Sequence, residues 1–317
     1  MHHSRYILRK KRKRRRRLAF FLLLFLGISV FFGLNFIYNT IKASQNIFED
    51  LDSSKVTGYT GTNIKVTEEP FNILLVGLEE QNGGKRSDVL MLITVNPSTE
   101  KVYILSIPRD TKTYIPALGY ETKISHSYGE AGISSTIETV SRFLDVPINY
   151  YISANFEGFE DIVDTIGGIT VEVPFTFKAQ LTGSLQWKTF YKGEMHLNGN
   201  EALAYVRMRK DDPKGDLGRN ERQQQVIKAI IDKGVSLSTI PKLDDIMEDL
   251  GDNVRTNIPL SHFKDFINLY KKLKDKPFET LTIEGSGEWH DDVWYYIADE
   301  YSVLEISETL RNALELK

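Results

Sequence analysis

Arginines and carboxylates are the side chains of this 317-residue sequence best suited to chemistry. Arg207 and Arg209 stand two apart at the end of a stretch whose residues 202–208 are predicted to be extended, so their side chains are expected on one face. Arg219 and Gln223 are one helical turn apart and continue the apolar stripe of a helix predicted over 221–234, with Arg222 beside them. Guanidinium groups bind phosphate through paired hydrogen bonds, and a helix N-terminus adds free N–H donors. This combination favours a pyrophosphate over a carboxylate as ligand.

Two carboxylates are expected near the arginines. Glu79 ends one predicted strand and Asp88 begins the next, while Arg109 and Asp110 follow a third. Glu79 and Asp88 would repel a pyrophosphate unless a hard cation lay between them, and Mg²⁺ is the expected bridge because it binds carboxylate and phosphate oxygens together. The same spacing also fits a surface salt-bridge network, which would contribute little energy. Spacing alone leaves both interpretations open.

Three apolar runs predict the strands that position these residues. They cover 72–78, 89–95 and 101–107, and runs of this kind are typical of strands buried on both faces. The turn at 96–100 is short enough to require an antiparallel hairpin, and the glycine-containing link over 79–88 favours a second one. The carboxylates and Arg109 should then lie on one rim of the sheet, where ligands of α/β proteins usually bind.

The remaining pattern alternates helices and strands, which indicates an α/β fold with a mixed sheet flanked by helices. Helices are predicted over 130–143, 156–166, 221–234, 260–273 and 303–314, strands over 150–153, 169–173 and 279–283, and a surface insertion or hairpin over 174–197. We expect a single extracytoplasmic catalytic core over 71–235, followed by an α/β extension over 236–317 that packs on the core.

The N-terminal segment predicts a membrane anchor. Residues 1–17 contain ten basic side chains and no acidic one, and 18–41 form an apolar stretch long enough to cross a bilayer once. Basic residues stay on the cytoplasmic side, so the N-terminus is expected inside, with a polar stalk over 42–70 and the rest of the chain outside. A cleavable signal peptide has a similar layout, but no small-x-small cleavage site follows the apolar stretch.

Composition excludes several classes of protein. The chain has no cysteine, which rules out disulfides, iron–sulfur clusters and a thiol nucleophile. Residues 18–317 carry 30 basic against 43 acidic side chains, a net charge of −13 that disfavours nucleic acid as a partner. Glycines 77, 83 and 84 match neither a Walker loop nor a dinucleotide fingerprint, and no histidine has the spacing of a zinc site.

Seven ordered motifs resemble the LytR-CpsA-Psr family of cell-wall proteins. They cover roughly residues 70–234 and begin at Asn72, Arg86, Ser106, Lys123, Ile166, Leu197 and Asp216. The resemblance implies a transferase that moves an anionic glycopolymer, of the wall teichoic acid or capsule type, from an undecaprenyl-pyrophosphate carrier to peptidoglycan. It also implies an apolar pocket for the polyprenyl tail, while the part after residue 236 lies outside the motifs.

The resemblance implies a role for each matching residue. Asp88 would hold Mg²⁺ together with Glu79, where the family more often has aspartate. Asp88, Arg109, Arg207 and Arg209 would be catalytic, and the pyrophosphate would be bound by Arg109, Lys123, Arg207, Arg209, Arg219, Arg222 and Gln223.

Three alternatives remain open from the sequence. The chain could be a pyrophosphatase that uses water as acceptor, or a non-catalytic protein that binds the lipid carrier. It could also be a membrane-bound transcriptional attenuator, although the acidic region after residue 17 disfavours DNA.

Overall fold

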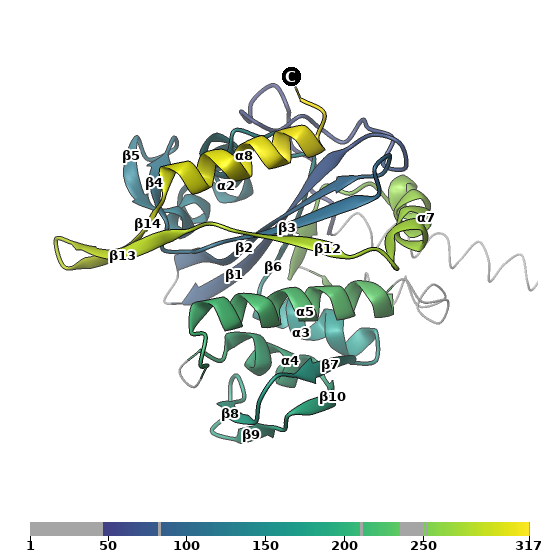
Figure 1. The fold of residues 1–317 in the computed structure, drawn as a ribbon, viewed down its shortest axis with the longest axis vertical. Helices are drawn as coiled ribbons and strands as arrows, with labels where there is room; N and C mark the ends of the chain where they lie inside the picture. Colours follow the sequence, from purple (N-terminus) through teal and green to yellow (C-terminus); the bar gives the residue numbers. More distant parts are fainter. Residues whose placement is uncertain (1–46, 82–83, 210–211, 235–249, 252, 317) are drawn as a thin grey trace, which may run out of the picture.

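The computed structural model describes residues 47–81, 84–209, 212–234, 250–251 and 253–316 (Figure 1). The basic tail 1–17 and the predicted anchor 18–41 lie outside these residues. Among the helices of the described part, none is both long enough and apolar enough to cross a membrane.

A six-stranded mixed sheet forms the centre of the domain, as the sequence predicted. Its order is β11-β6-β1-β2-β3-β12, in which β1 pairs with β6, and β3 with β12, in parallel, while the other neighbours are antiparallel. Both predicted hairpins, β1–β2 and β2–β3, are confirmed. The strands are β1 (Phe71–Gln81), β2 (Gly84–Asn96), β3 (Lys101–Ile107), β6 (Tyr150–Ala154), β11 (Val254–Thr256) and β12 (Phe278–Thr282).

Helices cover both faces of this sheet. One core contains Leu74 and Val76 of β1 with residues of α2 and α8, and the other contains Phe71 of β1 with Ile227 of α5 and Leu269 of α7. Figure 1 shows α2 and α8 on one side of the sheet and α5 on the other. These helices are α2 (Ser127–Leu144), which is kinked at Ala131 and Gly132, α5 (Asp216–Gly234), α7 (Phe263–Leu273) and α8 (Glu300–Ala313).

A third hydrophobic cluster lies beyond α5, where α3 and α4 pack together with short strands. The predicted insertion over 174–197 contains two hairpin partners, β8–β9, and the strand β10, which pairs with β7. The elements of this layer are α3 (Phe156–Thr165), β7 (Ile169–Val173), β8 (Phe177–Gln180), β9 (Trp187–Phe190), β10 (Gly193–Leu197) and α4 (Gly199–Arg207).

The prediction of an extended segment over 202–208 is wrong, because these residues belong to α4 and its C-cap. Asn198 and Glu201 form a capping box, in which each side chain bonds the other's backbone N–H and fixes the start of the helix. Arg207 is the last helical residue and Met208 is the C-cap, with an extended ψ of 132°. Arg207 and Arg209 therefore do not share a strand face.

Both segments outside the motifs contribute to the fold of the domain. Residues 47–70, predicted as a stalk, pack on the domain through Val56, Tyr59 and Val66, each at most 8% exposed. The C-terminal region supplies both edge strands of the central sheet, β11 and β12.

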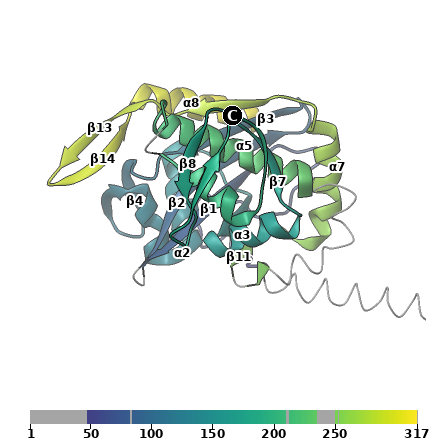
Figure 2. The same ribbon diagram turned by 90° about the horizontal axis from the view of Figure 1, so that it is seen from below.

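Two further hairpins lie above one end of the sheet. They are β4–β5 (Lys112–Ile115 and Tyr120–Lys123) and β13–β14 (Gly285–His290 and Val293–Ala298). The second hairpin projects away from the body in both views (Figures 1 and 2).

Candidate functional site

Two carboxylates meet at the rim where β1 ends and β2 begins. The register of these strands shifts between Gly77 and Leu78, so that Asp88 is an extra residue without a partner in the ladder, as in a β-bulge. Burial raises the pKa of Glu79, and the hydrogen bond and charge of the neighbouring Asp88 raise it further, while Arg207 and Arg109 partly offset this. The shift indicates two negative groups held close together.

Arg109 follows β3 and joins the rim to the next loop. Its Nη1 donates to Oδ2 of Asp88 at 2.8 Å, and its Nε lies 3.7 Å from Oδ2 of Asp110. The Arg109 side chain is 37% exposed, so part of it remains accessible to solvent.

Lys123 extends this group of charges at the end of β5. Its Nζ lies 2.7 Å from Oδ1 of Asp110 and 5.9 Å from the centre of the Tyr295 ring. The sequence predicted Lys123 as an anion ligand, but it did not indicate Tyr295, which comes from the β13–β14 hairpin 172 positions later.

Arg207 contacts one of these two carboxylates, Glu79. Its Nη2 lies 3.6 Å from Oε1 of Glu79, its Nη1 donates to the Thr182 hydroxyl at 3.3 Å, and its guanidinium carbon stands 4.5 Å from the centre of the Phe156 ring. The aromatic face and the hydroxyl orient the guanidinium, since Arg stacks favourably on aromatic rings. No sequence pattern pointed to Thr182 or Phe156.

The structure thus brings Glu79, Asp88, Arg109, Asp110, Lys123 and Arg207 into one chain of contacts. Arg209 follows the α4 C-cap and is exposed, whereas Arg219 and Gln223 are half-buried on the first two turns of α5. The next residue, Gln224, donates to the Ser106 hydroxyl at 3.2 Å on β3, three residues before Arg109. This contact places the first half of α5 against the strand that leads to the site.

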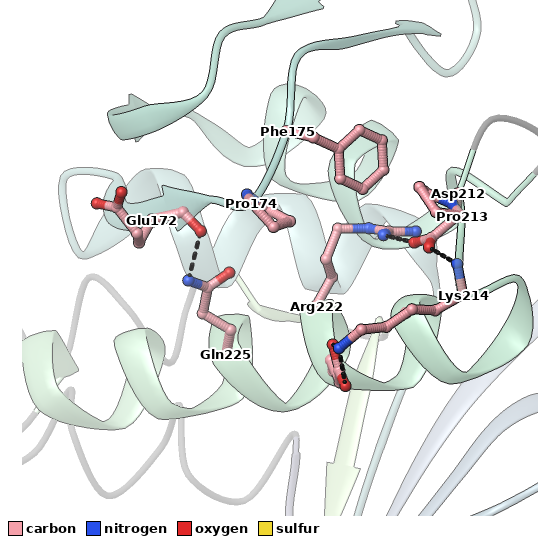
Figure 3. A pocket seen from close by; sticks show the side chains of 10 residues that line it. Glu172, Pro174, Phe175, Asp212, Pro213, Lys214, Arg222 and Gln225 are labelled. Carbon is pink, nitrogen blue, oxygen red and sulfur yellow. Dashed lines mark hydrogen bonds and ion pairs between the residues drawn. The ribbon is translucent and has the colours of Figure 1, made fainter.

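Arg222 occupies a different environment from the other arginines. Its side chain is 2% exposed, forms a buried ion pair with Asp212, and donates to the backbone carbonyls of Tyr205 and Met208. Figure 3 shows this pair beside a cavity of about 450 Å³ that Phe175 and Lys214 also line. The protein itself satisfies this guanidinium, which therefore holds Asp212 and the end of α4 against α5, and the predicted role of Arg222 in binding pyrophosphate stays a prediction.

The loop before α5 is built around that ion pair. Burial raises the pKa of Asp212, but hydrogen bonds from Arg222 and from the Lys214 backbone outweigh it and lower the pKa below its ordinary value. A Cβ on Gly218 would stand 2.2 Å from Oδ2 of Asp212, so a larger residue here would displace this carboxylate from its ion pair with Arg222. The loop carries Arg209 at one end and α5 at the other.

The residues present fit a magnesium ion that also binds a ligand. Glu79 and Asp88 are adjacent carboxylates, 17% and 18% exposed. Within the described ranges, no group of three or more acidic or histidine side chains is placed to hold a metal. Mg²⁺ commonly takes one or two carboxylates and completes its shell with waters and phosphate oxygens. The donor set therefore matches a metal that arrives with, or is completed by, a phosphorylated ligand.

Comparison with known proteins gives a consistent result. The model of the LytR-CpsA-Psr family matches residues 32–312. The polyisoprenyl-teichoic acid–peptidoglycan teichoic acid transferase TagU of Bacillus subtilis is 42% identical over 271 residues, which is 85% of this chain and 86% of that protein.

Solved structures agree with the sequence comparison. The crystal structure of B. subtilis TagV superposes with a TM-score of 0.69 at 39% identity, covering 79% of this chain and 99% of that one. A structure described as TagT bound to LI-WTA has a TM-score of 0.65 at 30% identity, covering 82% and 96%. Because the family match extends to residue 312, the region after residue 236 is part of the shared fold and not an addition to it.

Proposed function

Because the chain belongs to the LytR-CpsA-Psr family, we propose that it transfers an anionic glycopolymer, of the wall teichoic acid type, from a polyprenyl-pyrophosphate carrier to peptidoglycan. The observation that supports this best is the pair of adjacent carboxylates, Glu79 and Asp88, bracketed by Arg109 and Arg207. An anion between two guanidinium groups and a carboxylate-bound cation is the arrangement that phosphoryl transfer requires.

In this proposal the arginines bind and orient the pyrophosphate. Arg109 and Arg207 contact it from opposite sides, and Arg209, Arg219 and Gln223 extend the site along the start of α5. Mg²⁺ held by Glu79 and Asp88 would supply charge neutralisation for the phosphate oxygens. Arg222 supports the loop and makes no contact with the ligand.

The reaction exchanges a phosphoanhydride bond of the carrier for a phosphoester bond to the acceptor. A hydroxyl of the acceptor sugar attacks the phosphorus that carries the polymer, the bond to the bridging oxygen breaks, and polyprenyl phosphate leaves with the electron pair. Asp88 and Asp110 are the carboxylates available to accept the hydroxyl proton. The guanidinium groups stabilise the charge that develops on the leaving phosphate.

An apolar surface next to the rim fits a polyprenyl chain. On the sheet face toward α5, Ile73 and Leu75 of the central strand β1 and Ile152 of β6 are only partly buried, whereas Leu74 and Val76 on the opposite face are at most 2% exposed. Ile73 and Leu75 lead along β1 toward Glu79. Apolar residues left accessible in the middle of a sheet commonly mark a ligand site.

The N-terminal segment belongs to the same proposal. We place residues 18–41 as a single membrane span with the N-terminus inside, which keeps the domain outside and close to a lipid-linked substrate. Protease treatment of intact protoplasts should digest the domain; protection of the domain would contradict this topology.

The transfer assay uses the full chain, a lipid-linked teichoic acid precursor and uncrosslinked peptidoglycan oligomers. We expect polymer attached to peptidoglycan in the presence of Mg²⁺, little product with a chelator, and none with Asp88→Asn. Release of free phosphorylated polymer would instead identify a pyrophosphatase. Binding of the precursor without any turnover would identify a carrier-binding protein.

A further inference from the structure

The β8–β9 hairpin exposes three large apolar side chains. Leu185 is 91% exposed in the loop that joins the two strands, Trp187 is 65% exposed at the start of β9, and Tyr191 is 64% exposed directly after β9. Figure 1 shows the hairpin at the end of the domain opposite α8. Soluble proteins rarely expose large apolar groups so fully within one short segment unless a partner covers them. The hairpin therefore indicates a contact with something outside the domain.

The strand register separates an inner from an outer face of this hairpin. Phe177 pairs with Phe190, and both are at most 5% exposed, with ring centres 4.9 Å apart. Lys178 pairs with Thr189, and Trp187 stands two residues before Thr189 on the same strand. Since residues alternate between the two faces of a strand, Lys178, Thr189 and Trp187 share the face opposite the phenylalanines. The stacked rings hold the hairpin on the domain and leave Trp187 and Lys178 directed outward.

The charge of this hairpin is positive, although the domain as a whole is acidic. Residues 173–193 contain three lysines and no acidic side chain. Lys188 is paired with Glu201 at 2.6 Å, whereas Lys178 and Lys192 are exposed. The acidic residues that flank this segment, at positions 172 and 194, are cross-strand partners on the separate β7–β10 hairpin. The outer surface of β8–β9 therefore combines apolar side chains with two lysines that attract anionic groups.

The loop of the hairpin is attached to the candidate site. The Thr182 hydroxyl accepts a hydrogen bond from Nη1 of Arg207 at 3.3 Å, and the Thr182 carbonyl accepts one from Nδ2 of Asn200 at 3.1 Å. Arg207 and Asn200 both belong to α4. Leu185 follows three residues after Thr182, so the Cα atoms of these two residues lie within about 10 Å of each other. The apolar loop is therefore close to the arginine that contacts Glu79 at the rim.

From these observations we propose that the β8–β9 hairpin docks the domain on an anionic bilayer surface, an inference that rests on the proposed function. Leu185 enters the lipid, Trp187 and Tyr191 lie among the headgroups, and Lys178 and Lys192 contact anionic headgroups. Indole and phenol rings favour this interface, and lysines near it gain from the negative surface potential. A glycan could stack on the two aromatic rings but would leave the aliphatic Leu185 in water. Docking brings the arginine of α4 to the depth at which the pyrophosphate of a lipid carrier lies.

The test reconstitutes the full chain into phosphatidylglycerol vesicles whose acyl chains carry bromine, which quenches the fluorescence of tryptophans in contact with the lipid. Trp289 is the matched control, because it is also exposed, at 72%, but lies on the separate β13–β14 hairpin beside an acidic turn. We expect quenching in the wild type and in Trp289→Phe, and almost none in Trp187→Phe, which keeps an aromatic ring for docking. Lys178→Gln should lower the ratio of docked to undocked domain by about fivefold, the effect of removing one cation from an anionic membrane surface. Leu185→Asn should reduce the quenching of Trp187 without changing the midpoint of thermal unfolding.

Other outcomes overturn the proposal. Undiminished quenching in Trp187→Phe, or equal losses in both tryptophan variants, would reject the hairpin as the membrane contact. If bromolipids do not quench Trp187 but soluble poly(glycerol phosphate) shields it from acrylamide, the surface binds an anionic polymer and the proposal is wrong. Quenching is measured without donor or acceptor. A chain that docks through Trp187 but transfers no polymer would therefore contradict the proposed function and leave the membrane contact standing.

Discussion

Two arginine–aspartate pairs in this domain have the same chemistry and opposite surroundings. Arg222 and Asp212 are each 2% exposed and surrounded by protein, whereas Arg109 and Asp88 at the rim are 37% and 18% exposed. Arg222 also donates to two backbone carbonyls, while Arg109 is shared between two carboxylates. The buried pair, Arg222 and Asp212, therefore stabilises the fold. The accessible pair, Arg109 and Asp88, remains available to a ligand.

The difference shows why residue type alone does not identify a functional arginine. A buried ion pair is costly to form but also costly to break, because the remaining partner keeps its desolvation penalty. An accessible pair contributes little stability and can exchange its partner for a phosphate. The comparison therefore predicts opposite results for variants of the two arginines.

The largest effect is expected for Arg222→Met. Removing one partner from a buried ion pair typically destabilises a protein by about 3–5 kcal/mol. Urea denaturation of the domain should show this loss, and Lys214→Met is the matched control, because Lys214 is 59% exposed and pairs with Glu221 on the surface. The comparison fails if Arg222→Met keeps wild-type stability and loses only transfer activity.

Arg109→Ala should have the converse effect. Loss of a side chain that stabilises charge in the transition state typically lowers kcat by about 100- to 1000-fold. The midpoint of thermal unfolding should stay close to that of the wild type. Arg255→Ala serves as control, because that guanidinium donates to the carbonyls of Gly251 and Val254 beside the edge strand β11. Wild-type turnover by Arg109→Ala would remove this residue from the site.

The sequence predicts the centre of the fold well, for a simple reason. β1, β2 and β3 are continuous apolar runs joined by short links, so local pattern and final pairing agree. The rim follows directly from that pairing, which is why Glu79, Asp88 and Arg109 could be grouped before any coordinates were considered.

The features that the sequence did not predict have identifiable causes. The apolar residues of segment 202–208 led to the prediction of an extended segment. The capping box of Asn198 and Glu201 was a local signal for a helix instead. The burial of Arg222 depends on Asp212, ten positions earlier, which closes onto it only because α4 ends at Arg207 and the chain turns back. Such a contact depends on tertiary geometry that no periodicity encodes.

A third variant tests whether the two adjacent carboxylates of the rim destabilise the folded protein. Burial and the proximity of Asp88 raise the pKa of Glu79, so the folded state disfavours its ionised form, and stability falls as the pH rises through the titration range of this carboxyl. Glu79→Gln should therefore stabilise the metal-free protein. The expected gain is about 1 kcal/mol, the size typical of substitutions that remove an unfavourable interaction from a functional site. Thermal unfolding in the presence of a chelator measures this.

Magnesium provides the contrasting measurement for the same variant. Mg²⁺ should raise the unfolding temperature of the wild type, because a ligand that binds only the folded state stabilises it, and should have little effect on Glu79→Gln. A decrease in metal-free stability, or an equal magnesium shift in both proteins, would argue against two crowded carboxylates that share a cation.

The smallest effect concerns His126, which lies behind the rim and bonds the Thr122 hydroxyl at 3.1 Å. Burial lowers its pKa below 6.5, and the charges of Arg86 and Lys123 lower it further, while Asp110 opposes the shift. The unfolded chain then binds a proton more readily than the folded one, so stability is lost as the pH falls below about 6.5. His126→Asn should remove this part of the acid sensitivity, a change of less than about 1 kcal/mol for a partly buried group. Urea titrations at pH 7, 6 and 5 measure the slope, with His196→Asn as an exposed control. The unfolding free energy could instead change equally with pH in the wild type and in His126→Asn. That result would show that the positive charges of the rim do not affect His126, and that Arg86 and Lys123 are neutralised before any ligand binds.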